Sequence, residues 1–401
     1  MEFGFGPEDE VFRGEARAWL EEHLGGRDVS RREWERELGR AGWIGLGWDE
    51  DGHGNRRASL TQQVVWAEEY ARANAPARSG HIGENLLAPT LITHGTVEQK
   101  SRFLPPVARG EELWCQGYSE PGAGSDLAAV RTTAVRDTGG APGDSYRVTG
   151  QKIWTSLAHE ADWCFVLART QPQSLRHHGL TFLLVPMDQP GRIEVRPIRQ
   201  LTGTSEFNEV FFDGAVARAE HVVGGEGNGW RVAMSLLGYE RGVSTLAQQI
   251  GFAEELGRVV EAAVANGAVD DPVVRDCLVR LWAELRTMRW NALRTLGSSA
   301  DPEGPGGHGG PGGSGDAGAP SVAKLLWGRW HQRLGELAVR VRGVAAAVGP
   351  TDWTTSSPYE LDAFQHLFLF SRADTIYGGS DEIQRTIIAE RVLGLPKEPR
   401  G

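Results

Sequence analysis

Apolar residues recur at helical spacing in the first quarter of the chain. After Gly6-Pro7, one apolar face repeats every three or four residues until Gly25-Gly26. That face consists of Phe12, Ala16, Trp19, Leu20 and Leu24. Two later segments begin with capping boxes, Ser59-x-x-Gln62 and Thr96-x-x-Gln99, in which side chain and backbone satisfy each other's hydrogen-bonding groups. We therefore expect residues 7 to about 112 to be all-helical.

The pattern changes after residue 112, where short β-branched or aromatic runs are separated by Gly, Pro, Asp and Asn. The runs are Tyr146–Val148, Trp163–Leu167, Thr181–Val185, Ile193–Val195 and Val210–Phe212. No helical stretch separates them. This spacing predicts an antiparallel sheet or a small barrel over about 113–222.

Helical periodicity returns at Gly229, with long segments near 229–265, 272–296 and 321–347 and shorter ones after them. In the third long segment one stripe is apolar: Val322, Leu325, Leu326, Trp330, Leu334, Leu337 and Val341. Residues 301–320 contain nine Gly and four Pro but no Leu, Ile, Val, Phe or Met, which predicts a disordered surface loop. The predicted fold is α+β and mostly α, with an N-terminal helical domain (1–112), a central antiparallel β-domain (113–222) and a C-terminal helical domain (223–401).

Charge and composition exclude several classes of protein. The 401 residues carry 42 Lys and Arg against 53 Asp and Glu, a net charge of −11. This sign disfavours a nucleic-acid partner, whose phosphates require basic residues. The three cysteines are far apart and form no metal-binding pattern, which fits a reduced cytoplasm. No apolar run reaches the roughly twenty residues of a membrane span, and the first residues are acidic where a signal peptide is basic.

Two segments have residues suited to binding a cofactor. Cys115–Asp126 contains a Gly-rich turn after Pro121 whose backbone N–H groups could hold a phosphate or a flavin edge, or simply join two strands. Gly150–Ser156 places an aromatic ring and two hydroxyls at the end of a strand, where a half-buried strand end is the alternative.

Two further patterns fail as motifs. Gly225-Glu-Gly-Asn-Gly229 is followed by a long helix with no second strand, so it is not a dinucleotide-binding fingerprint. His159-Glu160-Ala-Asp162 lacks the second His of a zinc helix, and no metal is expected.

Together these segments resemble the acyl-CoA dehydrogenase family over nearly the whole chain. YSEPGAGSDLA is similar to the family's flavin and acyl-CoA signature, VTGQKIWTS to its second flavin segment, and NEVFFDGAV with VVGGEGNGW to the exit from its sheet. TIYGGSDEIQRTIIAERVLGL resembles its C-terminal signature, and PEDEVFRGEARAWLEEHL and GENLLAPTLITHGTVEQKSRFLP its helical first domain. The resemblance implies a helical domain, a central β-domain and a C-terminal four-helix domain that bind FAD.

The resemblance also implies roles for particular residues. Tyr118 and Ser119 would contact the flavin ring, and Ser125 the flavin or the acyl-CoA. In Trp154, Thr155 and Ser156, the indole would cover the ring and the last hydroxyl would reach N5. The adenosine half of FAD would lie near Ser380 and Glu382.

The sequence departs from the family pattern in the position of its catalytic base. Where many members have a Glu after the Tyr of the C-terminal signature, this chain has Gly378, which cannot take a proton. A subset that includes isovaleryl-, long-chain- and actinobacterial steroid side-chain-type enzymes has its Glu on the central helix before an Arg, as Glu240 and Arg241 are here. A solvated ion pair is the alternative, but Leu236, Leu237 and Val243 place Glu240 beside an apolar stripe.

A second departure concerns the segments that hold the far end of FAD. The family's Arg-x-x-Phe-Gly segment, which reaches the flavin pyrophosphate across a dimer, is replaced by Asp271–Asp276, with Arg275 as its candidate. The Gln-x-x-Gly-Gly segment has no clear counterpart around Val341–Pro350.

These observations predict a FAD-dependent acyl-thioester dehydrogenase. Glu240 would take the α-proton, Arg241 would contact substrate, and the Gly378 N–H would polarise the thioester carbonyl. By resemblance, an electron-transferring flavoprotein would reoxidise the flavin, and the chain would form a homodimer or homotetramer. A flavin oxidase or monooxygenase and a non-catalytic subunit of a mixed tetramer remain as alternatives.

Overall fold

The structure is a computed structural model that describes residues 5–25, 29–48, 54–137, 144–174, 176–239, 243–300, 318–349 and 360–397. The side chains of 243–247 and 295–300 are not part of this description. Contacts divide the chain into two compact units. The first comprises residues 8–199 and 205–241, and the second comprises 1–7, 200–204 and 242–401.

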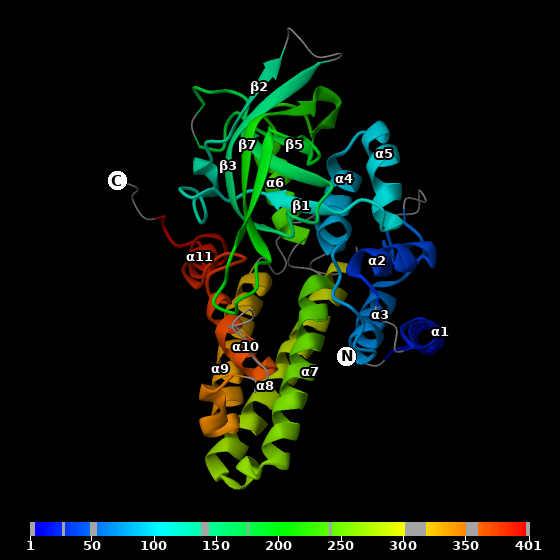
Figure 1. Ribbon diagram of the computed structural model, residues 1–401, viewed down its shortest axis with the longest axis vertical. Helices are drawn as coiled ribbons and strands as arrows, with labels where there is room; N and C mark the ends of the chain where they lie inside the picture. Colours follow the sequence, from blue (N-terminus) through cyan, green and yellow to red (C-terminus); the bar gives the residue numbers. More distant parts are fainter. Residues whose placement is uncertain are drawn as a thin grey trace. The chain divides into compact units, whose positions relative to one another are not determined.

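The first unit begins with the helices predicted from the sequence (Figure 1). They are α1 (Pro7–Leu24), α2 (Arg31–Arg40), α3 (Leu60–Arg72), the π-helical turn η1 (Gly83–Leu87), α4 (Ala88–His94) and α5 (Val97–Ala108). Both predicted capping boxes are present, at Ser59 and Thr96, and a third caps α2 at Ser30.

The strands of the first unit form one eight-stranded sheet in the order β6-β7-β3-β2-β4-β5-β8, with β1 paired to β4. They are β1 (Trp114–Gly117), β2 (Thr133–Asp137), β3 (Ser145–Ser156), β4 (Trp163–Arg169), β5 (Leu180–Pro186), β6 (Ile193–Ile198), β7 (Phe207–Arg218) and β8 (Val222–Val223). Short 3-10 turns cover Leu127–Ala129 and Ala219–His221. The predicted α+β fold with a central sheet is confirmed.

The pairing is antiparallel, as predicted, except around β4. Strand β1 runs parallel to β4, with Cys115 opposite Cys164, and Thr133 of β2 makes a parallel pair with Arg169. The reason is the route of the chain, since the segment after β1 does not turn back into a neighbouring strand but crosses to β2.

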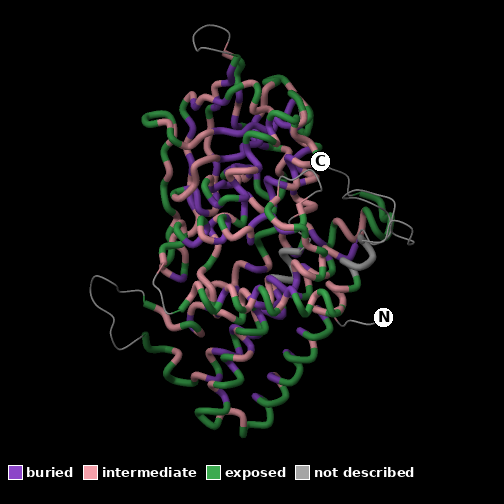
Figure 2. Tube along the Cα trace, turned by 90° about the vertical axis from the view of Figure 1, so that its right-hand side faces the viewer, coloured by how far each residue is buried: buried purple, intermediate pink, exposed green. Residues whose placement is uncertain are grey.

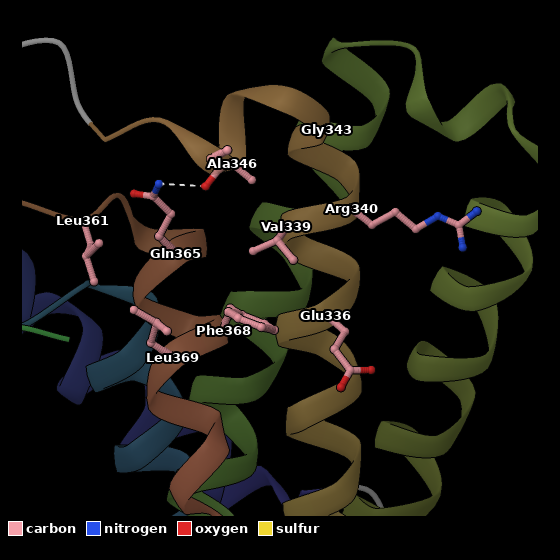
Figure 3. A pocket seen from close by; sticks show the side chains of 10 residues that line it. Glu336, Val339, Arg340, Gly343, Ala346, Leu361, Gln365, Phe368 and Leu369 are labelled. Atoms are coloured by element: carbon pink, nitrogen blue, oxygen red, sulfur yellow. Dashed lines mark hydrogen bonds between the residues drawn. The ribbon is translucent and has the colours of Figure 1, made fainter. Parts of the chain in front are cut away.

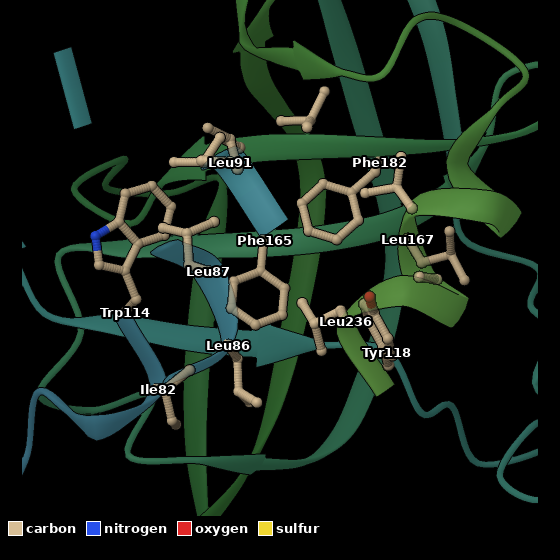
Figure 4. Packing of buried hydrophobic residues seen from close by; sticks show 14 of the residues in the cluster. Ile82, Leu86, Leu87, Leu91, Trp114, Tyr118, Phe165, Leu167, Phe182 and Leu236 are labelled. Atoms are coloured by element: carbon tan, nitrogen blue, oxygen red, sulfur yellow. The ribbon is translucent and has the colours of Figure 1, made fainter. Parts of the chain in front are cut away.

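Helix α6 (Gly229–Tyr239) packs on this sheet through Val232, Ala233 and Leu236. The cluster joins η1, α4 and α5 with strands β1, β4 and β5, and Figure 4 shows Phe165, Phe182 and Leu236 at its centre. One core therefore connects the N-terminal helices, the sheet and α6. It includes Tyr118, which directly follows β1.

The second unit is helical. Its elements are α7 (Val243–Ala265), η4 (Ala268–Asp270), α8 (Pro272–Ala300), α9 (Ala319–Arg342), η5 (Gly343–Ala347), α10 (Ala363–Phe370), η6 (Ser371–Ala373), α11 (Asp381–Ile387) and the π-helical turn η7 (Ile388–Val392). Residues 301–317 of the predicted loop lie outside the described residues. The last two residues of that predicted loop are helical, because Pro320 occupies the first turn of α9, where its missing N–H costs nothing.

Burial on α9 differs from the predicted apolar stripe. Trp330, Leu334, Leu337 and Val341 are buried as predicted, but Val322 is 40% and Leu326 is 50% exposed. The start of the helix instead turns Lys324 inward, and two turns further on the helix buries His331. Figure 2 shows the corresponding alternation of buried and exposed residues along the long helices. Of the helices the structure describes, none is long and apolar enough to span a membrane.

Candidate active site

The ends of β1 and β3 bring two of the predicted cofactor segments together. The N–H of Ile153 donates to the carbonyl oxygen of Ser119 over 2.9 Å, which joins the Tyr118–Ser119 backbone to the end of β3. The Tyr118 ring is buried and packs edge-on against Phe165 and Phe182. The ring thus anchors this segment in the core beneath the sheet.

The Gly-rich turn that follows leaves its tip open. Glu120 and Ala123 close the turn with two backbone hydrogen bonds of 3.1 and 3.0 Å. A Cβ added at Gly122 or Gly124 would meet nothing within 4 Å, and Ser125 is exposed. The base of the turn is a tight connection, as expected of a segment that simply joins two strands. Its tip is open and can approach a ligand.

Trp154 is the most unusual residue of this group. It has a positive φ of 60°, which is rare for a bulky residue, and its side chain is 57% exposed. The register of β3 against β7 shifts between Lys152 and Thr155, so a bulge turns the indole out of the sheet. Strained backbone of this kind gathers at functional sites.

A buried ion pair that sequence reasoning did not single out lies beneath these segments. Lys152 is fully buried and its ammonium donates to a Glu120 carboxylate oxygen (2.8 Å) and to the carbonyls of Tyr118 (3.0 Å) and Leu167 (2.8 Å). Burial would raise the pKa of Glu120, but the Lys152 ammonium, together with hydrogen bonds from Thr132 and Arg131, outweighs burial and holds that pKa below its usual value. A single Lys therefore fixes the Tyr118 backbone, the Gly-rich turn and β4 at once.

The side chains left available by this arrangement suit a planar heteroaromatic ring. Within the described part of the chain, the hydroxyls of Ser119, Ser125 and Ser156 make no hydrogen bond, and the buried Thr155 hydroxyl has no partner either. An exposed indole stands beside them. An aromatic face with spare hydrogen-bonding groups fits a flavin ring, which offers a π-surface and edge nitrogens and oxygens.

The second group of candidate residues lies in the helical unit. Gly378 and Gly379 both have positive φ, 63° and 84°, in a turn between η6 and α11. Ser380 caps α11 by accepting from the Ile383 N–H. Glu382 is exposed in the first turn, where hydrogen bonds to its own backbone N–H and to the Ser380 side chain lower its pKa. Among the described residues, no group accepts a hydrogen bond from the Gly378 N–H.

Arg275 stands apart from this second group. It lies in the first turn of α8, and its guanidinium donates to the Val269 carbonyl over 3.4 Å. The connection between α7 and α8 lies at the end of the bundle away from α11 (Figure 1). The helical unit therefore does not bring Arg275 to Ser380 and Glu382.

A cavity of about 750 Å³ opens where the expected Gln-x-x-Gly-Gly segment would follow α9. Its walls come from α9, η5 and α10 (Figure 3). Phe368, Leu369 and Val339 make it largely apolar, and the Gln365 amide donates to the carbonyls of Ala346 and Val348. The missing motif is thus replaced by an apolar wall with Glu336 and Arg340 at its edge.

Glu240 and Arg241 lie outside the described residues. The helix that leads to them is described as far as Tyr239, and its Leu236 is fully buried while Leu237 packs partly against the same core. The apolar neighbours expected one turn before Glu240 are therefore in place.

Three family models match the chain in order. They are the acyl-CoA dehydrogenase N-terminal domain at residues 6–111, the middle domain at 115–215 and the C-terminal domain at 227–393. The acyl-CoA dehydrogenases IpdE1 of Mycobacterium tuberculosis and of Mycolicibacterium smegmatis are both 52% identical, over 98% of this chain and 99% and 100% of theirs.

Solved structures show the same fold. The Tcur3481–Tcur3483 steroid ACAD superposes with a TM-score of 0.83 at 28% identity, covering 99% of this chain and 100% of that one. The ChsE4–ChsE5 complex from Mycobacterium tuberculosis gives 0.78 at 31% identity with the same coverage. The chain therefore belongs to the acyl-CoA dehydrogenase family and is an FAD-dependent oxidoreductase that catalyses acyl-CoA dehydrogenation.

Proposed function

We propose that Glu240 removes the α-proton of an acyl thioester while the β-hydrogen leaves with its electron pair, giving the trans-2-enoyl thioester. FAD, when bound, supplies the hydride acceptor. The observation that carries the proposal is the turn at Gly378, which has no side chain and a left-handed backbone. A carboxylate must then come from another element, and Glu240 follows the buried face of α6.

The Gly378 N–H would polarise the thioester carbonyl, because an α-proton is removed only when charge can spread onto that oxygen. Its N–H has no acceptor in the described part of the chain, which leaves it available. The positive φ values of Gly378 and Gly379 set the direction of this peptide without a side chain in the way.

The flavin would be held by the group at the ends of β1 and β3. We assign the ring to Tyr118, Ser119, Trp154, Thr155 and Ser156, and the flavin or acyl-CoA contact to Ser125. The exposed indole and the free hydroxyls support this assignment. Ser380 and Glu382 would lie near the adenosine half, Arg275 would serve the pyrophosphate of a second subunit, and Arg241 would contact substrate.

The acyl group we propose is bulky and steroid-derived. Gly378 in the carbonyl-binding turn leaves room for a wide substrate, since among the described residues an added Cβ there would have only Lys324 within 4 Å. The steroid ACAD named above supports the class. By resemblance to the family, an electron-transferring flavoprotein would accept the electrons, and the chain would act as a cytoplasmic homodimer or homotetramer.

The protein purified by itself should be yellow with non-covalent FAD. Mixing it anaerobically with a panel of acyl-CoA thioesters, straight-chain, branched and steroid-derived, should bleach the flavin fastest with the steroid-derived ones. Bleaching by straight-chain thioesters alone would contradict the substrate class, and bleaching by none of them would contradict the reaction.

A second candidate is a subunit of a two-chain complex that lacks activity by itself. The ChsE4–ChsE5 complex and the Tcur3481–Tcur3483 pair are each named for two chains, which favours this alternative. The same purification separates the two possibilities. A colourless protein that takes up FAD only with a homologous chain would establish the subunit role.

A further inference from the structure

The turn that contains Gly378 rests on a network of buried charges around Asp374. The Asp374 side chain is completely buried; one oxygen accepts from His331 Nδ1 over 2.5 Å and the other from the Tyr377 hydroxyl over 2.7 Å. The Asp374 main-chain carbonyl accepts from the Lys324 ammonium. Tyr377 directly precedes Gly378, so this network ends at the peptide whose N–H has no acceptor among the described residues.

His331 connects the network to a third helix. Its Nε2 meets a carboxylate oxygen of Glu255 on α7 at 2.8 Å, while its Nδ1 meets Asp374. Ionised carboxylates only accept hydrogen bonds, so both ring nitrogens donate and the ring is an imidazolium. Burial would lower the pKa of His331, but the hydrogen bonds to Asp374 and Glu255 outweigh it and raise that pKa to about 9.

Helix α9 is shaped to receive this segment. A Cβ at Gly328 would lie 3.1 Å from the Asp374 carbonyl oxygen, and one at Gly335 would lie 2.8 Å from the Ser371 hydroxyl. The two glycines let the backbone of 371–374 lie directly on the helix, with His331 between them. The Gln384 amide donates to the carbonyls of Gly378 and Gly379 over 3.2 Å from the other side.

We propose that His331 is a positioning residue: anchored on Glu255, it fixes Asp374, which fixes Tyr377 and so aims the Gly378 N–H. This inference rests on the proposed function, in which that N–H binds the thioester carbonyl. His331 touches neither substrate nor cofactor in this proposal. It acts only through Asp374 and Tyr377.

The positioning depends on the charge of His331. Two carboxylates meet the ring directly, Glu255 on α7 and Asp374 after η6, and Asp374 is shared with Tyr377. The other charged groups on the neighbouring elements already have partners. They are Lys324 on α9, bound to the Asp374 carbonyl, Glu284 of α8, paired with Arg333, and Asp381 of α11, paired with Arg329 and Arg385. Loss of the proton leaves the imidazole ring with one N–H to donate to either Glu255 or Asp374. Because the folded pKa of His331 is raised, its stabilising contribution is complete below pH about 6.5 and is lost as the pH rises through about 9.

The test is hydrogen–deuterium exchange of the holoenzyme in peptides covering 374–384, from pH 7 to 10, corrected for the intrinsic pH dependence of exchange. The parent should lose protection above pH about 9. His331→Gln should show low protection already at pH 7 and no change above it. Arg333 lies on the same helix as His331 and forms an exposed ion pair with Glu284 of α8. Arg333→Gln, which breaks that pair, should therefore behave as the parent.

Kinetics supply a second readout. Misplacing the carbonyl donor should lower kcat for the acyl thioester by roughly ten- to a hundredfold and leave KM nearly unchanged. If His331→Gln keeps the protection and the kcat of the parent, the proposal is wrong. It is also wrong if protection falls equally throughout the helical unit, because His331 would then have only a structural role.

Tyr377→Phe keeps the inference testable if His331→Gln does not fold. It removes one hydroxyl of a partly exposed ring and leaves His331 and Glu255 intact. The peptides covering 374–384 should again lose protection, and unchanged protection would overturn the proposal. A parent that no acyl thioester reduces would instead contradict the proposed function, while the exchange data would still decide whether His331 holds the turn.

Discussion

Glu240→Gln should lower the rate of substrate-driven flavin reduction by about two to four orders of magnitude, the scale of a positioned general base. The amide has nearly the shape and volume of the carboxylate, so the change removes the base with little change in side-chain size. FAD content and thioester binding should therefore stay as in the parent. Stopped-flow absorbance of the flavin under anaerobic conditions measures the rate directly.

Glu254→Gln is the matched control, because it makes the same chemical change on α7 at an exposed carboxylate. The flavin of this variant should be reduced by substrate as fast as that of the parent. If Glu240→Gln also reduces at the parent rate, the base lies elsewhere or the reaction is not α,β-dehydrogenation. The fold and the family membership would stand in either case.

Moving the carboxylate to the other family position should restore only part of the rate. In Glu240→Gly with Gly378→Glu, the new Cβ would lie 3.7 Å from Lys324 Cε and 4.0 Å from its Nζ. An ammonium so near would pair with the new carboxylate and make it a weaker base. The positive φ at this position adds strain for any side chain.

Lys152→Met should lower the free energy of unfolding by about 3–5 kcal/mol, because removing one partner of a buried pair leaves the other uncompensated. The Glu120 carboxylate and the Tyr118 and Leu167 carbonyls would all lose a donor. Urea denaturation followed by far-ultraviolet circular dichroism measures the change. The FAD content should fall as well, since the Tyr118 backbone is no longer fixed.

The double variant Lys152→Met with Glu120→Gln is the companion measurement. Its neutral amide removes the stranded charge, so it should be more stable than Lys152→Met alone. In the parent, the lowered pKa of Glu120 means that the stabilisation is present above pH about 4.5 and is lost as the pH falls through the folded pKa. A loss below about 1 kcal/mol in Lys152→Met would contradict this account of the pair.

Local patterns predicted the helices and most strands because their causes are local. The capping boxes at Ser59 and Thr96 need only residues three positions apart, and the strand runs are bounded by their own turn residues. The predicted runs did not include β1, β2 or β8. Strand β1, for example, has only four residues and pairs with the distant segment Trp163–Val166. Nothing within such a short run indicates that it belongs to a sheet.

The polar residues that build the site were harder to predict because distant segments determine their burial. Lys152 has the appearance of a surface Lys in the sequence, yet Glu120 and two carbonyls enclose it. Likewise, Val322 and Leu326 fit an apolar stripe by spacing, but α9 turns Lys324 and His331 inward to meet Asp374. A Lys and a His at positions aligned with buried Trp327 and Leu334 were the available signal.

The parallel pairing of β1 with β4 gives the loop between β1 and β2 an unusual freedom. In a hairpin, the length of a loop fixes the register of the strands it joins. Here β1 and β2 are not partners of one another, and their registers are set by β4 and β3. We therefore expect that the exposed tip, Gly124–Asp126, can gain, lose or exchange residues over evolution while Tyr118 and Trp154 keep their alignment. Ligand preference and scaffold could then change independently.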